Sequence, residues 1–255
     1  MKITILGCGG AAGVPTISKG WGNCDPNNPK NRRRRPAIMV EEGATKILID
    51  TPPDLREQLI ETDTRRLDAV LFTHNHADHI HGLDDLREIN RAMNCSLDIW
   101  GDAVTLETIR RRFEYAFTPM NPGATFIYKP LLNPREIVGP FTVNGVEVLP
   151  IYQDHGYGDS LAFRFGKFAY STDLVRMPEE SFAALAGIEV WIVACLVDFK
   201  HETHADLDTV LGWIERIKPR QAILTHMSHY LDYETLLRKL PSGVEPGYDG
   251  MVIEL

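Results

Sequence analysis

The chain has 255 residues, of which 44% are hydrophobic and 24% are charged. This ordinary globular composition excludes a disordered, collagen-like or coiled-coil protein. Lys and Arg number 27 against 35 Asp and Glu, which gives a formal net charge of −8. Because nucleic acids and anionic membranes bind positively charged surfaces, this charge argues against a general binder of either. No composition break divides the chain, so we expect a single domain over residues 1–255.

The cysteines give no sign of a disulfide framework or a thiolate zinc site, because they lie far apart without a Cys-x-x-Cys pair: Cys8, Cys24, Cys95 and Cys195. Free thiols in a reducing compartment are expected. No stretch reaches the length of a membrane span. The apolar run over residues 3–6 is too short for a signal peptide. We therefore expect a cytoplasmic protein without a membrane partner.

The first half of the chain predicts strands at 2–6, 37–41, 46–50, 69–73 and 97–100, the second and third forming a hairpin. Helices are predicted over 52–60, where proline suits the first turn, and over 83–93 and 104–115. Residues 119–140 are rich in Pro, Gly and Asn, and we expect them to be irregular.

The second half predicts two strands within 141–151, a hairpin over 161–165 and 168–171, and strands at 190–194 and 221–224. Helices are expected over 179–186, 206–217 and 233–240. Because many neighbouring strands form hairpins, the pattern favours mixed sheets flanked by helices over a purely parallel, doubly wound sheet.

A glycine cluster follows the first strand. The motif Gly7-x-Gly9-x-x-Ala12 matches the dinucleotide-binding fingerprint in its residue pattern alone. That fingerprint requires a helix directly after it, because the helix N-terminus holds the pyrophosphate. Here Pro15 follows soon after and disfavours helical geometry at Val14. We interpret the cluster as a tight turn with close backbone approach, able to border an active site.

The strongest signal is the motif Thr73-His74-Asn75-His76-Ala77-Asp78-His79, directly after the fourth predicted strand. Sites in sheet proteins assemble at such strand ends, and clustered imidazoles are hard to satisfy in a partly buried loop without a ligand. His74 and His76 alternate along an extended turn and can face one cation. Asp78 and His79 follow as the chain bends and can reach a second cation beside it.

Each cation needs further ligands, because zinc and manganese sites take four to six donors. Three later strand ends offer them: His155 follows the strand that ends at 151, Asp173 follows the strand over 168–171, and His226 follows the strand over 221–224. Taken singly, each is more often a structural residue. Taken together with the histidine motif, ligand roles become the favoured interpretation.

This pattern resembles the metallo-β-lactamase superfamily of binuclear hydrolases over essentially the whole chain. The resemblance implies an αββα sandwich of two mixed β-sheets flanked by helices, with the site at one edge. It implies two divalent metal ions per chain, Mn²⁺ or Zn²⁺, since the donor set suits either. By this resemblance one metal is bound by His74, His76 and His155, the other by Asp78, His79 and His226, and Asp173 bridges them.

Within the superfamily, the loop over residues 7–15 resembles the phosphodiesterase branch, and most specifically the phosphoribosyl cyclic phosphate phosphodiesterases of the carbon–phosphorus lyase pathway. Four further segments share this resemblance: the Arg-rich run ending at Arg35, Ile49-Asp50, residues 204–211 and residues 247–251. In that family the histidine matching His204 donates a proton to the leaving group. His201 is expected to be a solvated neighbour.

The chain departs from that family near its N-terminus, where family members carry a cysteine cluster that holds a structural zinc with a downstream histidine. Here the region contains only Cys24, although His229 matches the downstream histidine. A closed zinc site needs about four protein donors, so no third metal is expected. The nearby run Arg32 to Arg35 is either a solvated charge run or, through one or two members, a phosphate-binding element.

The implied function is a binuclear metal-dependent phosphodiesterase, a phosphoric diester hydrolase acting on a small cyclic or nucleotide-like phosphodiester. Two cations about 3.5–4 Å apart can share a water and lower its pKa, so that a bridging hydroxide is the nucleophile. The catalytic candidates are Asp78 and His204, with protonated His204 donating to the departing alkoxide.

Three alternatives stay open. The same centre hydrolyses thioesters and lactones elsewhere in the superfamily. A tRNA-processing-like nuclease is disfavoured by the net charge of −8 and by the lack of a long basic arm. A catalytically silent, metal-stabilised nucleotide-binding protein is disfavoured by the complete ligand set. The expected partner is a small phosphodiester substrate, and a homodimer is a candidate assembly.

Overall fold

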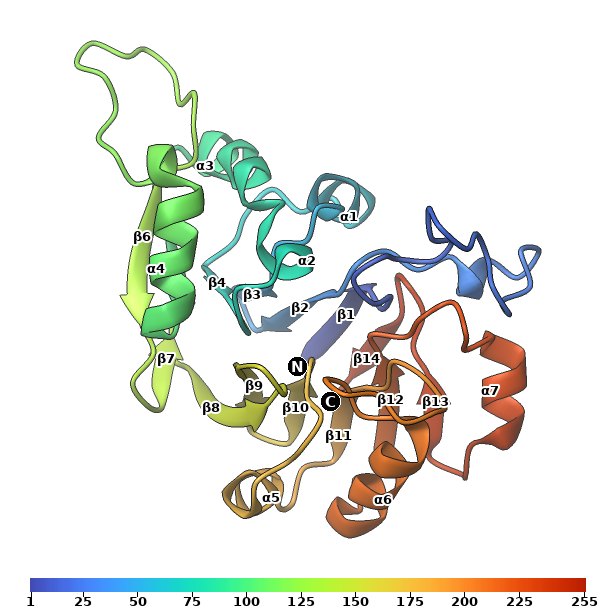
Figure 1. Cartoon of the computed structure of the whole chain (residues 1–255). Helices are drawn as coiled ribbons and strands as arrows, with labels where there is room; N and C mark the ends of the chain where they lie inside the picture. The colour runs from blue at the N-terminus through green and yellow to red at the C-terminus, as the bar shows by residue number, and fades with distance from the viewer.

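Two mixed sheets pack face to face in the computed structural model, which describes residues 1–255, and helices cover the outer face of each (Figure 1). The first sheet has the order β14 (Val252–Glu254), β1 (Lys2–Gly7), β2 (Ala37–Glu42), β3 (Thr45–Ile49), β4 (Ala69–Leu71), β5 (Leu97–Gly101) and β6 (Leu132–Glu136). Strands β3 to β6 are parallel, whereas β14, β1, β2 and β3 pair antiparallel.

The second sheet has the order β13 (Val244–Pro246), β12 (Gln221–Thr225), β11 (Val190–Ala194), β10 (Phe168–Ser171), β9 (Asp159–Phe165), β8 (Val146–Asp154) and β7 (Phe141–Val143). Strands β10 to β13 are parallel, and β7 to β10 are antiparallel. The predicted αββα sandwich is therefore confirmed, including its mixed sheets.

Four helices lie on the side of the first sheet: α1 (Leu55–Glu61), α2 (Ala77–Ile80), α3 (Leu86–Met93) and α4 (Ala103–Arg112). Three lie on the side of the second sheet: α5 (Glu179–Leu185), α6 (Leu207–Ile217) and α7 (Tyr233–Lys239). Short 3₁₀ turns occupy Pro29–Asn31, Leu83–Asp85 and Glu114–Ala116. None of these helices combines the length and the apolar character that crossing a membrane requires.

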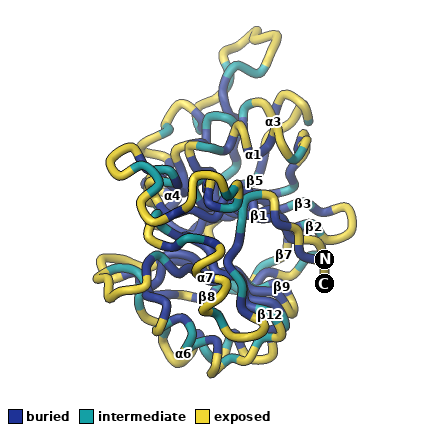
Figure 2. The backbone as a smooth tube through the Cα atoms, turned by 90° about the vertical axis from the view of Figure 1, so that its right-hand side faces the viewer, coloured by how far each residue is buried: buried dark blue, intermediate teal, exposed yellow.

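Alternation along the strands builds the core on both faces of the first sheet. In β3, Ile47 and Ile49 belong to the apolar cluster between the sheets, whereas Leu48 belongs to the cluster under α1, α3 and α4. Successive side chains of a strand point to opposite faces, so a sheet covered on both faces needs apolar residues at every position. Figure 2 shows the result, with buried strands at the centre and exposed loops around them.

The prediction of an irregular segment over 119–140 is wrong at its end, because β6 forms there and pairs in parallel with β5. Pro134 lacks a backbone N–H and argues against a central strand, but β6 lies at the edge of its sheet, where proline is tolerated. The helix predicted over 104–115 ends at Arg112 and gives way to a 3₁₀ turn. Strands β13 and β14, of three residues each, and helix α2 were not predicted.

Candidate metal centre

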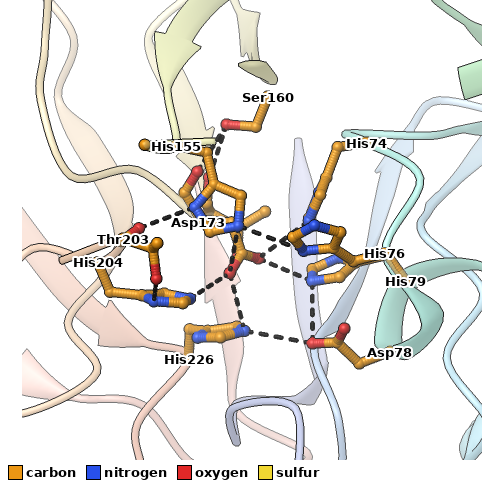
Figure 3. A network of polar contacts seen from close by, with 12 residues as sticks. His74, His76, Asp78, His79, His155, Ser160, Asp173, Thr203, His204 and His226 are labelled. Atoms are coloured by element: carbon orange, nitrogen blue, oxygen red, sulfur yellow. Dashed lines mark hydrogen bonds and ion pairs between the residues drawn. The ribbon is translucent and has the colours of Figure 1, made fainter. Parts of the chain in front are cut away.

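The seven predicted donors gather at one edge of the sandwich, where strands of both sheets end (Figure 3). The first sheet contributes His74, His76, Asp78 and His79 from the loop and short helix after β4. The second sheet contributes His155, Asp173 and His226, which follow β8, β10 and β12. Because β4, β10 and β12 each end at this edge, residues that lie far apart in sequence come to face one another.

The donor atoms form overlapping groups in which every atom lies within 4.8 Å of the others. One group is His74, His76 and His155, and another is Asp78, His79 and His226. These two groups coincide with the two metal-binding sets that the family resemblance implies. Two more groups contain Asp173, one with His74 and His79 and one with His155 and His204.

Asp173 lies between the two sets of donors. In one set, its carboxylate oxygens lie 2.7 Å from His79 Nε2 and 3.1 Å from His226 Nε2. In the other set, they lie 4.0 Å from His74 Nε2 and 3.9 Å from His155 Nε2. The residue is buried and has a φ of +48°, in the left-handed region that an aspartate enters more readily than most residues. This turn directs the carboxylate from the end of β10 toward imidazoles of both sheets, the position that a bridging ligand needs.

Three of the five site imidazoles, those of His74, His79 and His155, are held through their Nδ1 atoms. His79 Nδ1 donates to Asp50 Oδ2 at 2.7 Å, and His155 Nδ1 donates to the carbonyl of Thr203 at 2.8 Å. His74 Nδ1 lies 3.0 Å from the hydroxyl of Thr73. Anchoring Nδ1 fixes the tautomer and directs Nε2 into the site as a lone-pair donor, as in most metal-ligating histidines.

Unpaired buried nitrogens show that these residues fit a metal. The Nε2 atoms of His74, His79 and His226 are buried without a hydrogen-bond partner, because even the close approach of His79 to Asp173 lacks hydrogen-bonding geometry. Leaving one such group unpaired costs about 1–3 kcal/mol. Imidazole and carboxylate donors suit zinc or manganese, and divalent cations bound in the two donor sets would satisfy all three nitrogens.

The electrostatics of the pocket also favour a cation. Burial lowers the pKa of His74 well below its usual range, so this imidazole is a neutral donor. Burial alone would also lower the pKa of His79, but the carboxylates of Asp78, Asp173 and Asp50 raise it well above its usual range. Three clustered carboxylates require compensating positive charge, which a proton on His79 or a metal can supply.

Asp50 is a site residue that the sequence did not identify as one. It directly follows β3, is fully buried and has a φ of +66°. It accepts hydrogen bonds from the backbone N–H and hydroxyl of Thr73, at 2.9 and 2.8 Å, in addition to the bond from His79. Asp50 therefore joins the start of the histidine motif to one of its ligand candidates. The available signal was an aspartate directly after the strand next to β4, in the segment Ile49-Asp50 that shares the family resemblance.

His204 lies inside the site. Its Nε2 is 2.9 Å from Asp173 Oδ1, its Nδ1 is 2.9 Å from the hydroxyl of Thr203, and its ring stacks on His226 at 5.2 Å. The residue is half-buried on the loop between β11 and α6. This position brings a titratable nitrogen to the donor cluster from the loop of the second sheet.

The arginine run is not a solvated charge run, because its members have partners within the fold. Arg33 is buried and donates to the carbonyl of Ser228 at 3.0 Å. Arg34 pairs with Asp249 and Glu61, Arg35 pairs with Asp54 through two nitrogens, and Arg32 lies over the ring of Trp21. These contacts fasten the N-terminal loop to its surroundings.

The glycine cluster borders the site. A Cβ on Gly10 would lie 2.8 Å from Leu196 Cδ1 and 3.5 Å from the ring of His226. Gly10 N–H also donates to the carbonyl of Met227. The absent side chain thus lets the first loop pack against the His226 loop, and no helix follows the cluster. Cys24, near this loop, belongs to none of the donor groups, nor does His229.

Comparison with known proteins places the chain in a family. Residues 45–227 match the beta-lactamase superfamily domain, so the chain belongs to that superfamily. The crystal structure of a diphosphatase from the PhnP family matches with a TM-score of 0.91 at 31% identity, covering 100% of this chain and 97% of that one.

More distant structures share the fold. Zn²⁺-bound PqqB from Methylobacterium extorquens matches with a TM-score of 0.76 at 18% identity, over the whole of both chains. Among curated proteins, an octanoyltransferase of Porphyromonas gingivalis is 32% identical over 98% of this chain and 51% of its own length. A ribonuclease Z of Bradyrhizobium sp. is 27% identical over 54% of this chain and 46% of its own length. The chain thus spans about half the length of the curated relatives it matches.

Proposed function

We propose that the chain is a binuclear metal-dependent phosphodiesterase that hydrolyses a small cyclic or nucleotide-like phosphodiester or diphosphate. The observation that best supports this is the pair of donor sets, His74–His76–His155 and Asp78–His79–His226, on either side of Asp173. The 31% identity to a diphosphatase over the full chain supports a reaction at phosphorus.

Two divalent cations held by these donors would acidify water and offset charge on phosphoryl oxygens. The chain itself contributes orientation. Asp50 holds the ring of His79, and Thr203 holds that of His155, so these donors are in place before substrate arrives. The ring of His76 is exposed whereas those of His74 and His155 are buried, so the site is open to substrate on the side of His76.

His204 is the proposed general acid. Thr203 Oγ1 fixes its Nδ1 side, and its Nε2 faces the donor cluster beside Asp173. A proton held at Nε2 can therefore pass to an oxygen that leaves phosphorus at this point. General acid catalysis of this kind typically contributes about 10²–10⁴-fold. Asp78, which is grouped with the metal donors and lies 3.5 Å from His226 Nε2, is the second catalytic candidate.

The test is a substrate panel with the metal-loaded protein and His74→Ala as the inactive reference. The panel contains bis(p-nitrophenyl) phosphate, a ribose cyclic phosphate, a dinucleoside diphosphate, a phosphomonoester, a thioester, a lactone and a precursor tRNA. We expect turnover of the diesters or the diphosphate, little turnover of the monoester, and loss of activity with chelator. Faster hydrolysis of the thioester, the lactone or the tRNA than of every small phosphorus substrate would contradict the proposal.

A further inference from the structure

Three of the six exposed aromatic side chains of the chain lie on the loops that hold the candidate metal centre. The six are Tyr115, Phe126, Tyr152, Tyr157, Phe199 and Tyr230. Tyr157 follows His155 by two residues, Phe199 lies on the loop of His204, and Tyr230 lies on the loop of His226. We refer to Tyr157, Phe199 and Tyr230 as the aromatic rim.

The loops of Phe199 and Tyr230 lie side by side. The backbone N–H and the hydroxyl of Ser228 both donate to the carbonyl of Leu196, at 3.1 and 2.7 Å. Further along, the rings of Phe199 and Tyr230 meet edge to face at 5.3 Å. The same two loops also bring His204 and His226 together at 5.2 Å. The Phe199–Tyr230 pair and the histidines His204 and His226 therefore lie on the same two loops.

The third rim residue is tied to the same loop. The hydroxyl of Tyr157 donates to Glu202 at 3.3 Å, and Glu202 lies between Phe199 and His204 in the sequence. The loops of His155, His204 and His226 thus each carry an exposed aromatic ring in addition to a histidine of the site. The side chains of Tyr157, Phe199 and Tyr230 are 89%, 48% and 40% exposed, so burial in the core does not explain them.

The chemistry of the rim selects a flat, largely uncharged group. The loop over residues 196–205 has one lysine and no arginine, and Lys200 pairs with Asp206 at 2.8 Å, so its charge is already compensated. His229 adds a ring 4.2 Å from that of Tyr230. Exposed Phe and Tyr rings bind flat aromatic groups by stacking, and this is how proteins hold nucleobases without reading their sequence.

We infer that the aromatic rim binds the nucleobase of the substrate, on the side of the site where His204 protonates the leaving oxygen. The inference rests on the proposed phosphodiesterase function and narrows its substrate class to nucleotides, as opposed to simple sugar phosphates. The phosphorus of the substrate then lies at the donor cluster, and its base stacks on the exposed surface of the Phe199–Tyr230 pair.

The kinetic test uses two substrates with the same reacting group. Adenosine 2′,3′-cyclic phosphate carries a base, and 1-O-methylribose 2′,3′-cyclic phosphate does not. We expect the parent protein to prefer the first by about ten- to hundredfold in kcat/KM, the size of one stacked base. Phe199→Ala and Tyr230→Ala should bring this ratio toward one by raising the KM for the adenosine substrate. Phe199→Tyr and Tyr230→Phe keep an aromatic ring and should keep the ratio. Phe126→Ala, at an exposed aromatic off the site loops, is the control.

A binding measurement separates this inference from the proposed function. Calorimetric titration of the metal-loaded protein with AMP and with ribose 5-phosphate should show tighter binding of AMP, lost in Phe199→Ala with metal content unchanged. If no phosphodiester is hydrolysed but this preference appears, the rim stands and the proposed function fails. Equal binding of the two ligands, or a Phe199→Ala variant that loses metal or both cyclic substrates equally, would overturn the inference.

Discussion

At the scale of single residues, Asp173 is the side chain through which the two sheets meet, because its carboxylate lies among imidazoles of both. Replacing it by alanine removes a donor from each metal set. We expect Asp173→Ala to lower metal content below one ion per chain, and to cost more activity than the about 10- to 100-fold typical of losing an outer-shell partner. Elemental analysis of protein purified without chelator measures this, with about two ions expected for the parent.

Asp173→Asn is the matched control, because it keeps the shape of the side chain and removes its charge. If the alanine variant retains two well-occupied metals, the bridging role is wrong. A folded variant is recognised by an unchanged circular dichroism spectrum.

A substitution at Asp50 tests whether a residue outside the donor groups contributes to metal binding. Asp50 contacts His79 and Thr73 and belongs to none of the donor groups. Asp50→Asn keeps an acceptor oxygen but removes the charge that orients the imidazole. We expect metal affinity to fall by about 10- to 100-fold with the secondary structure retained. Competition with a chromogenic chelator gives the affinity, and an affinity equal to that of the parent would mean that Asp50 only holds the loop.

His204→Ala separates proton donation from metal binding. A p-nitrophenolate leaves readily without a proton, whereas a ribose alkoxide does not. We therefore expect the variant to keep both metals and much of its activity on bis(p-nitrophenyl) phosphate, and to lose about 10²–10⁴-fold on an alkyl or cyclic diester. Equal losses on both substrates would indicate phosphate binding, and loss of a metal would make His204 an additional donor with His155 and Asp173.

The sequence predicted the residues of the donor cluster, but not Asp50, which holds the ring of His79 in place. Three histidines and an aspartate within six residues have few structural explanations, and the remaining donors each follow a predicted strand. Asp50 gave no comparable signal, because its role depends on β3 lying beside β4 and on a backbone turn at positive φ. Pairing between strands and left-handed turns are set by the whole fold, so one sequence does not reveal them.

At the scale of elements, the internal strands and the edge strand β7 were predicted, whereas the other three edge strands, β6, β13 and β14, were not. Strand β6 contains Pro134, and β13 ends at Pro246. In a sequence, a proline argues against a strand because it has no backbone N–H. An edge strand tolerates proline, since one of its sides has no hydrogen-bonded partner. Helix α2 was missed for another reason, since its residues are the histidine motif itself and its single turn is shorter than any periodic pattern.

Helix α7 offers a pH-dependent prediction at its N-cap. Asp232 accepts hydrogen bonds from the backbone N–H groups of Thr235 and Asp25 and from the amide of Asn31. Burial alone would raise the pKa of Asp232, but these hydrogen bonds lower it to about 2. A lowered pKa in the folded state stabilises the protein above the unfolded value of about 3.9, and this contribution is lost as the pH falls toward 2.

We therefore expect Asp232→Ala to lower the free energy of unfolding by about 1 kcal/mol at pH 7, the usual value of an N-cap. The difference between variant and parent should shrink between pH 4 and pH 2. Urea titrations of both proteins in chelator measure it, since titration of the metal centre then affects both alike. A difference that stays constant over this range would show that the charge of Asp232 is not involved.

At the scale of the whole molecule, the site joins the two halves of the sandwich. The chain itself already connects them, since β14 follows the last strand of the second sheet, β13, and pairs with β1 in the first sheet. The donor cluster is a second connection, because both metal sets contain residues from each sheet. Without a cation, this connection contains three carboxylates and several unpaired imidazole nitrogens.

Metal binding should therefore stabilise the folded protein in addition to making it active. A ligand that binds only the native state stabilises it by about 2.7 kcal/mol when its concentration is 100 times its Kd. We expect chelator to lower the Tm of the parent by several degrees and added Mn²⁺ or Zn²⁺ to restore it. Asp173→Ala should melt at nearly the same temperature with and without chelator, since it has lost donors to both ions. Scanning calorimetry of the two proteins gives all four values, and a parent Tm that chelator leaves unchanged would mean that the sheets are held together without the metals.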